Sequence, residues 1–265
     1  MNRIEAKFTE LKNRSEKALV AFITAGDPDL GTTAALVRAM AAAGADIIEL
    51  GVPFSEPVAD GPVIQQASQR ALAGGTTLRG ILETVRSLRQ DVEVPLVLMS
   101  YYNPVYRFGL DGFAREAAAA GADGLIVPDL PVEEAGPLLA AADRAGLALI
   151  PLAAPTSTAA RLRRIARSAR GFLYCVALTG VTGAEQQPEE VRRLVARARE
   201  VSTLPVAVGF GVTTPARAAE VGALADGVVV GTAIVREVAR GGPDMTERVA
   251  GFTRELKTAL RRGHA

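Results

Sequence analysis

The sequence predicts an α/β fold of the (β/α)8, or TIM barrel, class with an extra N-terminal helix. Eight short apolar runs alternate with Ala-, Arg- and Glu-rich stretches along the 265 residues, and eight such units are typical of this barrel. The runs are continuously hydrophobic, which indicates parallel strands buried on both faces. No linker or low-complexity stretch divides the chain, so we expect one domain over residues 1–265. An open, doubly wound sheet stays possible, because periodicity does not show that a sheet closes.

The elements follow in order along the chain. The strands are predicted within residues 18–26, 46–53, 94–101, 124–131, 147–155, 172–178, 204–211 and 227–235. Amphipathic stretches between them predict helices. Further helices are predicted over about 2–13 and over 244–262. Four glycines follow helical stretches and predict helix ends: Gly44, Gly121, Gly146 and Gly222.

Composition excludes several classes of function. The net charge is +1, so no basic surface indicates binding to nucleic acid or to an anionic membrane. No apolar run approaches the ~20 residues of a membrane span, and the first residues lack the apolar core of a signal peptide. The sole cysteine, Cys175, cannot form an internal disulfide, which suits a reducing cytosol. We therefore expect a cytoplasmic protein with no nucleic-acid or membrane partner.

A census of strand ends narrows the chemistry, because barrel sites lie at the carboxyl ends of the strands. The only histidine, His264, is the penultimate residue, and no lysine follows a predicted strand. A histidine base, a zinc site and a Schiff-base lysine are thus disfavoured. What remains at or near strand ends is mostly carboxylate: Asp27, Glu49, Asp60, Asp129 and Glu185.

Glu49 is the most informative of these carboxylates. Strand alternation places it on one face with Ile47 and Gly51. If that face lines the barrel, burial raises the pKa of the carboxyl toward neutrality, which suits a general acid or base. A structural carboxylate bonded to a neighbouring hydroxyl or amide is the alternative. Asp60 follows eleven positions later in an Ala-Asp-Gly-Pro turn; it is either an ordinary turn residue or a second carboxylate facing Glu49 across a ligand.

Two glycine-rich strand ends predict a phosphate site. Gly209 and Gly211 precede a Thr-Thr-Pro helix start, and Gly231 and Thr232 open the next helix. Helix N-termini bind phosphate through backbone N–H groups, and the loops after strands seven and eight are the common barrel phosphate site. Ordinary turn glycines are the alternative. A further Gly-rich segment, 178–190, is predicted to be a mobile lid.

Aromatic residues gather near the same strand ends. Core packing is the default for each, but together they could line a flat apolar pocket for an aromatic ligand. They are Phe22, Tyr102, Tyr174 and Phe210. Asp129 is as well explained by hydrogen bonds to loop amides, and Cys175 by packing as a small hydrophobe.

The sequence resembles the tryptophan synthase alpha chain family over essentially its whole length. The segment 47–67, which holds Glu49 and Asp60, is the most specific part of the resemblance. The matching stretches are AFITAGDP (21–28), IIELGVPFSEPVADGPVIQQA (47–67), MSYYNP (99–104), GLIVPDLPVEE (124–134), GVTGA (180–184), VGFGV (208–212) and VGTAIV (230–235).

The resemblance implies a lyase that cleaves indole-3-glycerol phosphate to indole and glyceraldehyde 3-phosphate, in the last steps of L-tryptophan biosynthesis. Glu49 matches the acid/base carboxylate, which protonates the indole ring at C3 and then helps to remove the glyceryl hydroxyl proton. Asp60 matches the loop carboxylate that binds the indole N–H. Thr182 and Gly183 match the lid, with Thr182 placed to hydrogen-bond Asp60 on closure.

The resemblance also implies a set of binding residues. The indole pocket would comprise Phe22, Tyr102, Ile126, Tyr174, Phe210 and Val229. The phosphate would be held, mostly by backbone N–H groups, at Gly183, Phe210, Gly211, Gly231 and Thr232.

A beta chain carrying pyridoxal phosphate is the implied partner, in an alpha2-beta2 tetramer, with no cofactor in this chain. The implied contact surface comprises residues 53–62, 102–104 and 128–134. Three positions depart from the family pattern, with Glu56 for Asp, Thr232 for Ser and Ala177 for Ser. None of the three changes removes a catalytic group.

Three alternatives stay open. The chain could be a stand-alone indole-producing lyase, or another phosphate-binding barrel enzyme such as a thiamine phosphate synthase-like or isomerase enzyme. The missing strand-end lysine disfavours an indole-glycerol phosphate synthase. A regulatory subunit that only activates its partner is disfavoured by the buried Glu49, since an unpaired buried carboxylate is costly.

Overall fold

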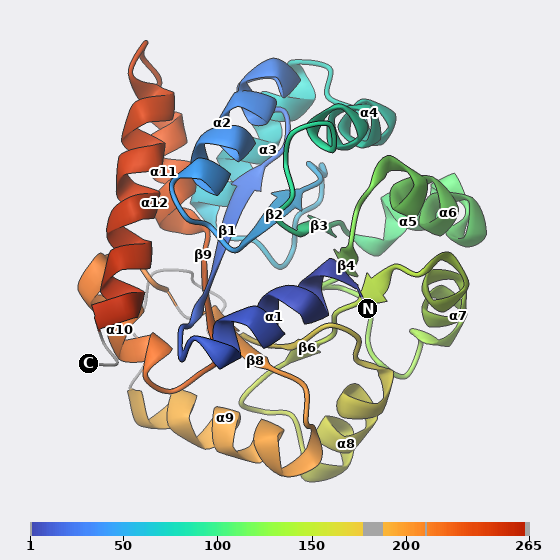
Figure 1. Ribbon diagram of the computed structural model, residues 1–265. Coiled ribbons are helices and arrows are strands. Elements are labelled where there is room, and N and C mark those ends of the chain that lie inside the picture. Colours follow the sequence, from blue (N-terminus) through green and yellow to red (C-terminus); the bar gives the residue numbers. More distant parts are fainter. Residues whose placement is uncertain (1, 177–187, 210, 263–265) are drawn as a thin grey trace.

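The computed structural model describes residues 2–176, 188–209 and 211–262. Its strands form one parallel sheet surrounded by helices (Figure 1). The strands are β1 (Ala18–Thr24), β2 (Ile47–Gly51), β3 (Leu96–Met99), β4 (Gly124–Ile126), β5 (Ala148–Leu149), β6 (Leu152–Ala153), β7 (Leu173–Val176), β8 (Val206–Gly209) and β9 (Gly227–Val230). The helices are α1 (Arg3–Asn13), α2 (Leu30–Ala42), α3 (Pro62–Ala73), α4 (Leu78–Leu88), α5 (Tyr102–Phe108), α6 (Leu110–Ala120), α7 (Gly136–Ala145), α8 (Ala159–Ser168), α9 (Pro188–Val201), α10 (Pro215–Gly222), α11 (Thr232–Ala239) and α12 (Met245–Arg262).

The sheet closes through its fifth predicted strand, which is split into β5 and β6. The strand order is β5-β4-β3-β2-β1-β9-β8-β7-β6, so β5 pairs with β4 while β6 pairs with β7. Between the two halves, Pro151 has no N–H to donate, but its carbonyl accepts from the Tyr174 N–H at 3.3 Å. One stretch of chain thus joins both edges of the sheet. The fold is the predicted TIM barrel, and the open-sheet alternative is wrong.

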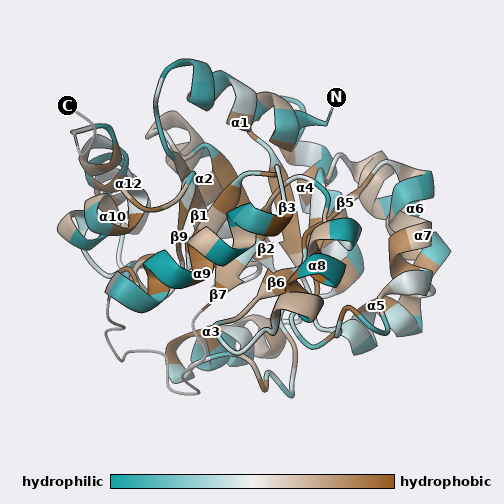
Figure 2. Ribbon diagram, turned by 90° about the horizontal axis from the view of Figure 1, so that it is seen from below, coloured by the Kyte–Doolittle hydropathy of each residue, from teal (hydrophilic) through white to brown (hydrophobic). Residues whose placement is uncertain are grey.

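Three apolar clusters form among the described residues, a small one around Phe22 and two large ones. One large cluster lies between the strands and the outer helices, and the other lies inside the barrel. Figure 2 shows hydrophobic residues gathered on the central strands and hydrophilic residues on the helices around them. Helix α1 closes the amino-terminal end of the barrel, because its buried Ile4, Phe8 and Leu11 belong to the inner cluster. The side of the barrel interior beneath the functional residues is therefore apolar and sealed.

Three strands begin with the same ionic anchor, at the end of the barrel that α1 closes. Asp46, Asp123 and Asp226, here called the strand-start aspartates, directly precede β2, β4 and β9. Each carboxylate accepts a backbone N–H from the neighbouring strand and pairs with a cation from another element. These partners are, in order, Leu19 and Lys257, Leu96 and Arg89, and Val206 and Arg199. The repeated anchor fixes where adjacent strands start relative to one another.

The predicted helix ends are confirmed at all four glycines, and three of the four have a left-handed φ. Gly44, Gly121 and Gly146 have φ values of 102°, 99° and 73°, which favour glycine at a helix end. Gly222 differs, because it is the last residue of α10 and lacks a left-handed φ. A Cβ there would lie 2.6 Å from Leu260 Cδ2 of α12, so close helix packing explains this glycine. Among the helices that the structure describes, none is long and apolar enough to cross a membrane.

Candidate active site

Glu49 lies inside the barrel, on the face of β2 that alternation predicts. It pairs in register with Phe22 of β1 and Val97 of β3. Only 1% of its surface is exposed, and its Oε2 has no hydrogen-bond partner within the described residues. Burial, with a smaller contribution from the charge of Asp60, raises the pKa of Glu49 to about 8. At neutral pH the group is therefore mainly a neutral carboxylic acid.

Asp60 lies on the loop that joins β2 to α3, residues 52–61, and faces Glu49 closely enough to affect its ionisation. Burial raises the pKa of Asp60 to about 6, although a hydrogen bond from Tyr101 favours the charged form. Near neutral pH the two carboxyls are thus in different states, with Asp60 mainly ionised and Glu49 mainly protonated. Such a separation of pKa values is typical of sites where one carboxyl acts as an acid and its neighbour stays ionised.

Tyr101 holds this loop and was missed in the sequence. Its hydroxyl accepts the Ala59 N–H at 2.9 Å and hydrogen-bonds Asp60. Its ring stacks on Phe54 of the same loop, with centroids 5.2 Å apart. Burial raises the pKa of the phenol, so the hydroxyl stays protonated and able to donate. The signal was available, because the alternation that places Met99 of β3 inside the barrel continues two residues further, to position 101.

Tyr102, the predicted pocket residue, lies elsewhere. It begins α5, its ring packs against Tyr106 with centroids 5.7 Å apart, and it contacts the outer apolar cluster. Its N–H donates to Asp129 Oδ1 at 2.8 Å, which confirms the structural reading of Asp129. Its part in the indole pocket stays a prediction. Asp27, another strand-end carboxylate, is bound at both oxygens by Arg70.

Two cavities open at the carboxyl ends of the strands, and the smaller one, of about 10 Å³, has room for about one water. A small cavity above Glu49 is lined from β1, β2, β3, the 52–61 loop and α3, by Phe22, Thr24, Gly51, Val52, Asp60, Ile64, Ser68, Met99 and Tyr101. A larger cavity of about 400 Å³ opens between the loops after β4 and β6 and reaches Leu152 and Val176, which pack against the inner cluster. Together these spaces are mostly apolar, with a few polar groups at fixed positions, as ligand sites usually are.

Glycines let two aromatic rings lie flat across neighbouring strands. A Cβ on Gly51 would lie 2.6 Å from the ring of Phe22, and one on Gly209 would lie 2.6 Å from the hydroxyl of Tyr174. Burial raises the pKa of Tyr174, and the charges of Glu49 and Asp60 add to this, so its ring lies near both carboxylates. Ile126 and Val229 are buried in the same inner cluster as Tyr174. The structure therefore brings together four of the predicted pocket residues, counting Phe22, which packs with Met99 beside them.

The predicted phosphate loops differ in how their helices begin. Thr214 caps α10, its hydroxyl accepting the Arg217 N–H at 3.2 Å. Gly231 caps α11 without a side-chain hydrogen bond, and no acidic residue lies in the first turn, which Thr232 opens. The amino end of α11 therefore keeps N–H groups for an anion. Gly211 has a φ of +54°. Thr182, Gly183, Phe210 and Glu185 lie outside the described residues.

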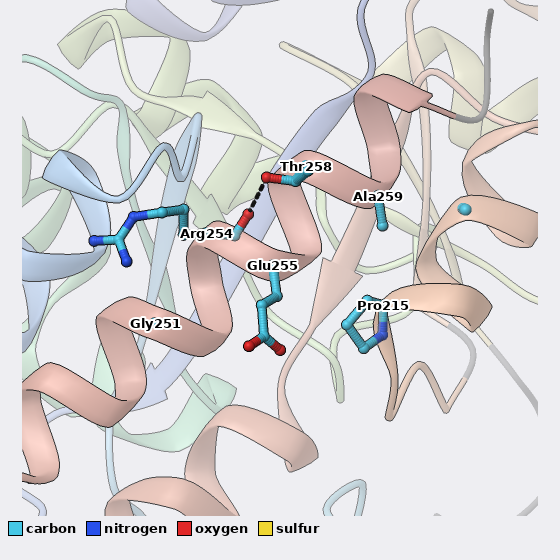
Figure 3. A pocket seen from close by; sticks show the side chains of 7 residues that line it. Pro215, Gly251, Arg254, Glu255, Thr258 and Ala259 are labelled. Atoms are coloured by element: carbon cyan, nitrogen blue, oxygen red, sulfur yellow. Dashed lines mark hydrogen bonds between the residues drawn. The ribbon is translucent and has the colours of Figure 1, made fainter.

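Two other features do not form part of this site. Cys175 is buried with a pKa raised to about 12 by burial, so it behaves as a packed hydrophobe. Figure 3 shows a hollow between α10 and α12, lined by Pro215, Ala219, Gly251, Arg254, Glu255, Thr258 and Ala259. Its charged side chains are exposed, so it lacks the desolvated carboxyls that distinguish the barrel interior.

Comparisons with known proteins agree with this geometry. Residues 8–261 match the family described as tryptophan synthase alpha chain. A protein of that name from Geobacter sulfurreducens is 55% identical over 262 residues, covering 98% of this chain and 99% of the relative. One from Phenylobacterium zucineum is 51% identical, covering 98% and 95%. Among solved structures, tryptophan synthase subunit alpha from Legionella pneumophila has a TM-score of 0.92 at 38% identity over 99% of both chains. A chain of Mycobacterium tuberculosis tryptophan synthase has a TM-score of 0.92 at 40% identity over 98% of both.

Proposed function

Because the chain belongs to the tryptophan synthase alpha chain family, it is a lyase that cleaves indole-3-glycerol phosphate, and we propose that Glu49 and Asp60 carry the reaction. The observation that supports this most directly is the state of Glu49, which is buried, unpartnered among the described residues and coupled to Asp60. A carboxyl whose pKa lies near the operating pH stays protonated and can still give up its proton, which suits a general acid.

The proposed reaction needs no group beyond these two carboxyls and the substrate. Glu49 gives its proton to C3 of the indole ring, which places positive charge on the ring nitrogen. The Asp60 carboxylate accepts the ring N–H hydrogen bond and stabilises that charge. The bond from C3 to the glyceryl chain then breaks, and its electron pair returns to the ring. The glyceryl hydroxyl gives its proton to Glu49 and becomes the aldehyde, so Glu49 ends protonated, as it began.

The remaining residues bind the two ends of the substrate. Phe22, Ile126, Tyr174 and Val229 are proposed to enclose the indole ring. All four are buried, Ile126, Tyr174 and Val229 in the inner cluster and Phe22 in a small cluster that also contacts Met99. The amino end of α11, at Gly231 and Thr232, is proposed to bind the phosphate, with Gly211 beside it. The uncapped first turn of α11 supports this assignment.

A beta chain is the partner that family membership implies. We propose an alpha2-beta2 assembly, with pyridoxal phosphate held by the beta chain, docked on residues 53–62, 102–104 and 128–134. Val58 on the 52–61 loop is 83% exposed and Tyr106 of α5 is 64% exposed. Val58 lies within the proposed contact surface, so a docked partner would remove this apolar side chain from water. The loop that carries Asp60 would then respond to partner binding.

An indole-release assay tests the proposal. The purified chain is incubated with indole-3-glycerol phosphate, with and without a beta chain. Glu49→Gln is expected to lose at least about 10³-fold in kcat, and Asp60→Asn somewhat less. Glu116→Gln, which removes an exposed carboxylate on α6, is the control and keeps full activity. Ordinary activity in Glu49→Gln contradicts its catalytic role. Rapid turnover without a beta chain favours the stand-alone lyase.

A further inference from the structure

A hydroxyl at the carboxyl end of β1 has no part in the chemistry above. Thr24 is 3% exposed, and its Oγ1 has no hydrogen-bond partner in the described part of the chain. Burying an unpaired hydroxyl destabilises a fold, and valine would fill the same space without that penalty. A threonine at position 24 is therefore better explained if its hydroxyl gains a hydrogen-bond partner in another state of the site.

The surroundings of Thr24 identify that partner. Thr24 lies two residues beyond Phe22 on the inner face of β1 and pairs in register with Gly51 of β2. The ring of Phe22 occupies the space that a side chain at Gly51 would need, and Thr24 lines the small cavity beside it together with Asp60 and Tyr101. The Tyr101 hydroxyl already bonds Asp60 and Ala59. The unpaired donor and the loop carboxylate thus share one small cavity.

We propose that Thr24 is a positioning residue for Asp60, whose carboxylate accepts a hydrogen bond from the Thr24 hydroxyl when substrate occupies the site. This inference rests on the proposed function, because it assigns Asp60 the task of binding the ring N–H. With Tyr101 bound to one side of the carboxylate and Thr24 to the other, rotation of Asp60 is restricted. Its remaining lone pairs then point toward the ring nitrogen.

The charges around Asp60 allow the proposal to be measured as a change in the pKa of Asp60. Among the described residues, the titratable groups that face it are Glu49 of β2, Tyr101 after β3 and Tyr174 of β7. On the loop after β1, the charge of Asp27 is paired with Arg70 of α3. Burial raises the pKa of Asp60 to about 6, and each donated hydrogen bond stabilises the ionised form. Loss of the Thr24 hydroxyl therefore raises the pKa of Asp60 in the occupied site.

The test compares Thr24→Val, which keeps the shape, with Thr24→Ser, which keeps the hydroxyl. Cleavage of indole-3-glycerol phosphate is measured from pH 5 to 9. In Thr24→Val we expect kcat to fall about tenfold, as for one hydrogen bond to a charged group, with KM changed less than about threefold. The acidic limb of the kcat profile moves to higher pH. Thr24→Ser restores both the rate and the limb. A Thr24→Val protein with the wild-type melting temperature, kcat and acidic limb overturns the proposal.

A second measurement separates this inference from the proposed reaction. Wild-type protein that does not cleave indole-3-glycerol phosphate contradicts the proposed function. The pKa of Asp60 is then followed directly by NMR of ¹³C-carboxyl aspartate, assigned with Asp60→Asn, in the presence of saturating indole as the probe. A higher Asp60 pKa in Thr24→Val than in wild type and Thr24→Ser supports the positioning role. Equal pKa values in the three proteins overturn it.

Discussion

The two ends of the barrel treat buried and half-buried carboxyls in opposite ways. At the end closed by α1, the strand-start aspartates Asp46, Asp123 and Asp226 each meet a cation and a backbone N–H. At the carboxyl ends of the strands, Glu49 and Asp60 have no ion pair among the described residues, and their pKa values rise to about 8 and about 6. The same kind of side chain is thus anchored at one end and left able to exchange protons at the other.

The difference teaches that pairing, in addition to burial, separates structural carboxyls from reactive ones. Burial raises the pKa of Asp46 too, but Lys257 and the Leu19 N–H oppose that rise. A cation and N–H donors compensate for the loss of water around a carboxylate. Without a cation and N–H donors, protonation removes the charge of the carboxylate at the lowest free-energy cost, and the carboxyl becomes an acid. Variants that remove a paired carboxylate at one end, or a carboxyl or its hydrogen-bond donor at the other, test the comparison.

The largest effect on stability is expected from an anchor, in Asp123→Ala. This change leaves the half-buried Arg89 without its carboxylate and the Leu96 N–H without its acceptor. We expect a loss of about 3–5 kcal/mol in the free energy of unfolding, measured by urea titration, and normal activity per folded molecule. Asp111→Ala is the control, because its pair with Arg144 is exposed at both ends and contributes about 0–1 kcal/mol. Equal losses in the free energy of unfolding of Asp123→Ala and Asp111→Ala would contradict the anchoring role given to Asp123.

Glu49→Gln is expected to raise the free energy of unfolding, by about 2–4 kcal/mol at pH 9. The folded pKa of Glu49 is raised, so the folded state favours the protonated group. Wild-type stability associated with Glu49 is therefore fully present below about pH 4.5, is lost as pH rises toward about 8, and is lost completely above that. Glutamine does not ionise, so the variant becomes more stable than wild type as pH rises. Melting temperatures across this pH range measure the difference in stability between the variant and wild type, here called the gap. Glu116→Gln, at an exposed site, should show no gap. A gap that does not grow with pH contradicts the raised pKa.

The pH dependence of activity should reflect both carboxyls. The proposed reaction requires Asp60 ionised and Glu49 protonated in the free enzyme. We expect kcat/KM to fall about tenfold per pH unit below about 6 and above about 8. Steady-state assays over pH 5–10 measure the two limbs. In Asp60→Asn the acidic limb should disappear while the basic limb stays. An acidic limb that persists in that variant would assign it to another group.

Much of this organisation follows from the sequence, and the rest depends on packing. Continuous apolar runs predict the strands, and period-two alternation places Glu49 inside the barrel, because both depend only on local geometry. The break at Pro151 and the pairing of Asp123 with Arg89 depend on residues distant in sequence. The repeated Ala-Asp before β2, β4 and β9 is visible in the sequence, but the cations that it meets are not. The position of Asp60 near Glu49 depends on the conformation of the 52–61 loop, which turn propensity alone does not determine.

The choice between Tyr101 and Tyr102 provides the finest test of the comparison, because adjacent residues of a strand end face opposite ways. Tyr101→Phe removes the hydroxyl that bonds both Asp60 and the Ala59 N–H. We expect a loss of about five- to tenfold in kcat, as for one hydrogen bond to a charged group, and an acidic limb moved to higher pH because the ionised Asp60 loses a donor. The same assay on Tyr102→Phe should leave the acidic limb in place, since the ring of Tyr102 packs against Tyr106 rather than against the loop. If Tyr102→Phe moves the limb and Tyr101→Phe does not, Asp60 in the working enzyme is held by a different face of the β3 end, and the 52–61 loop must rearrange before the reaction.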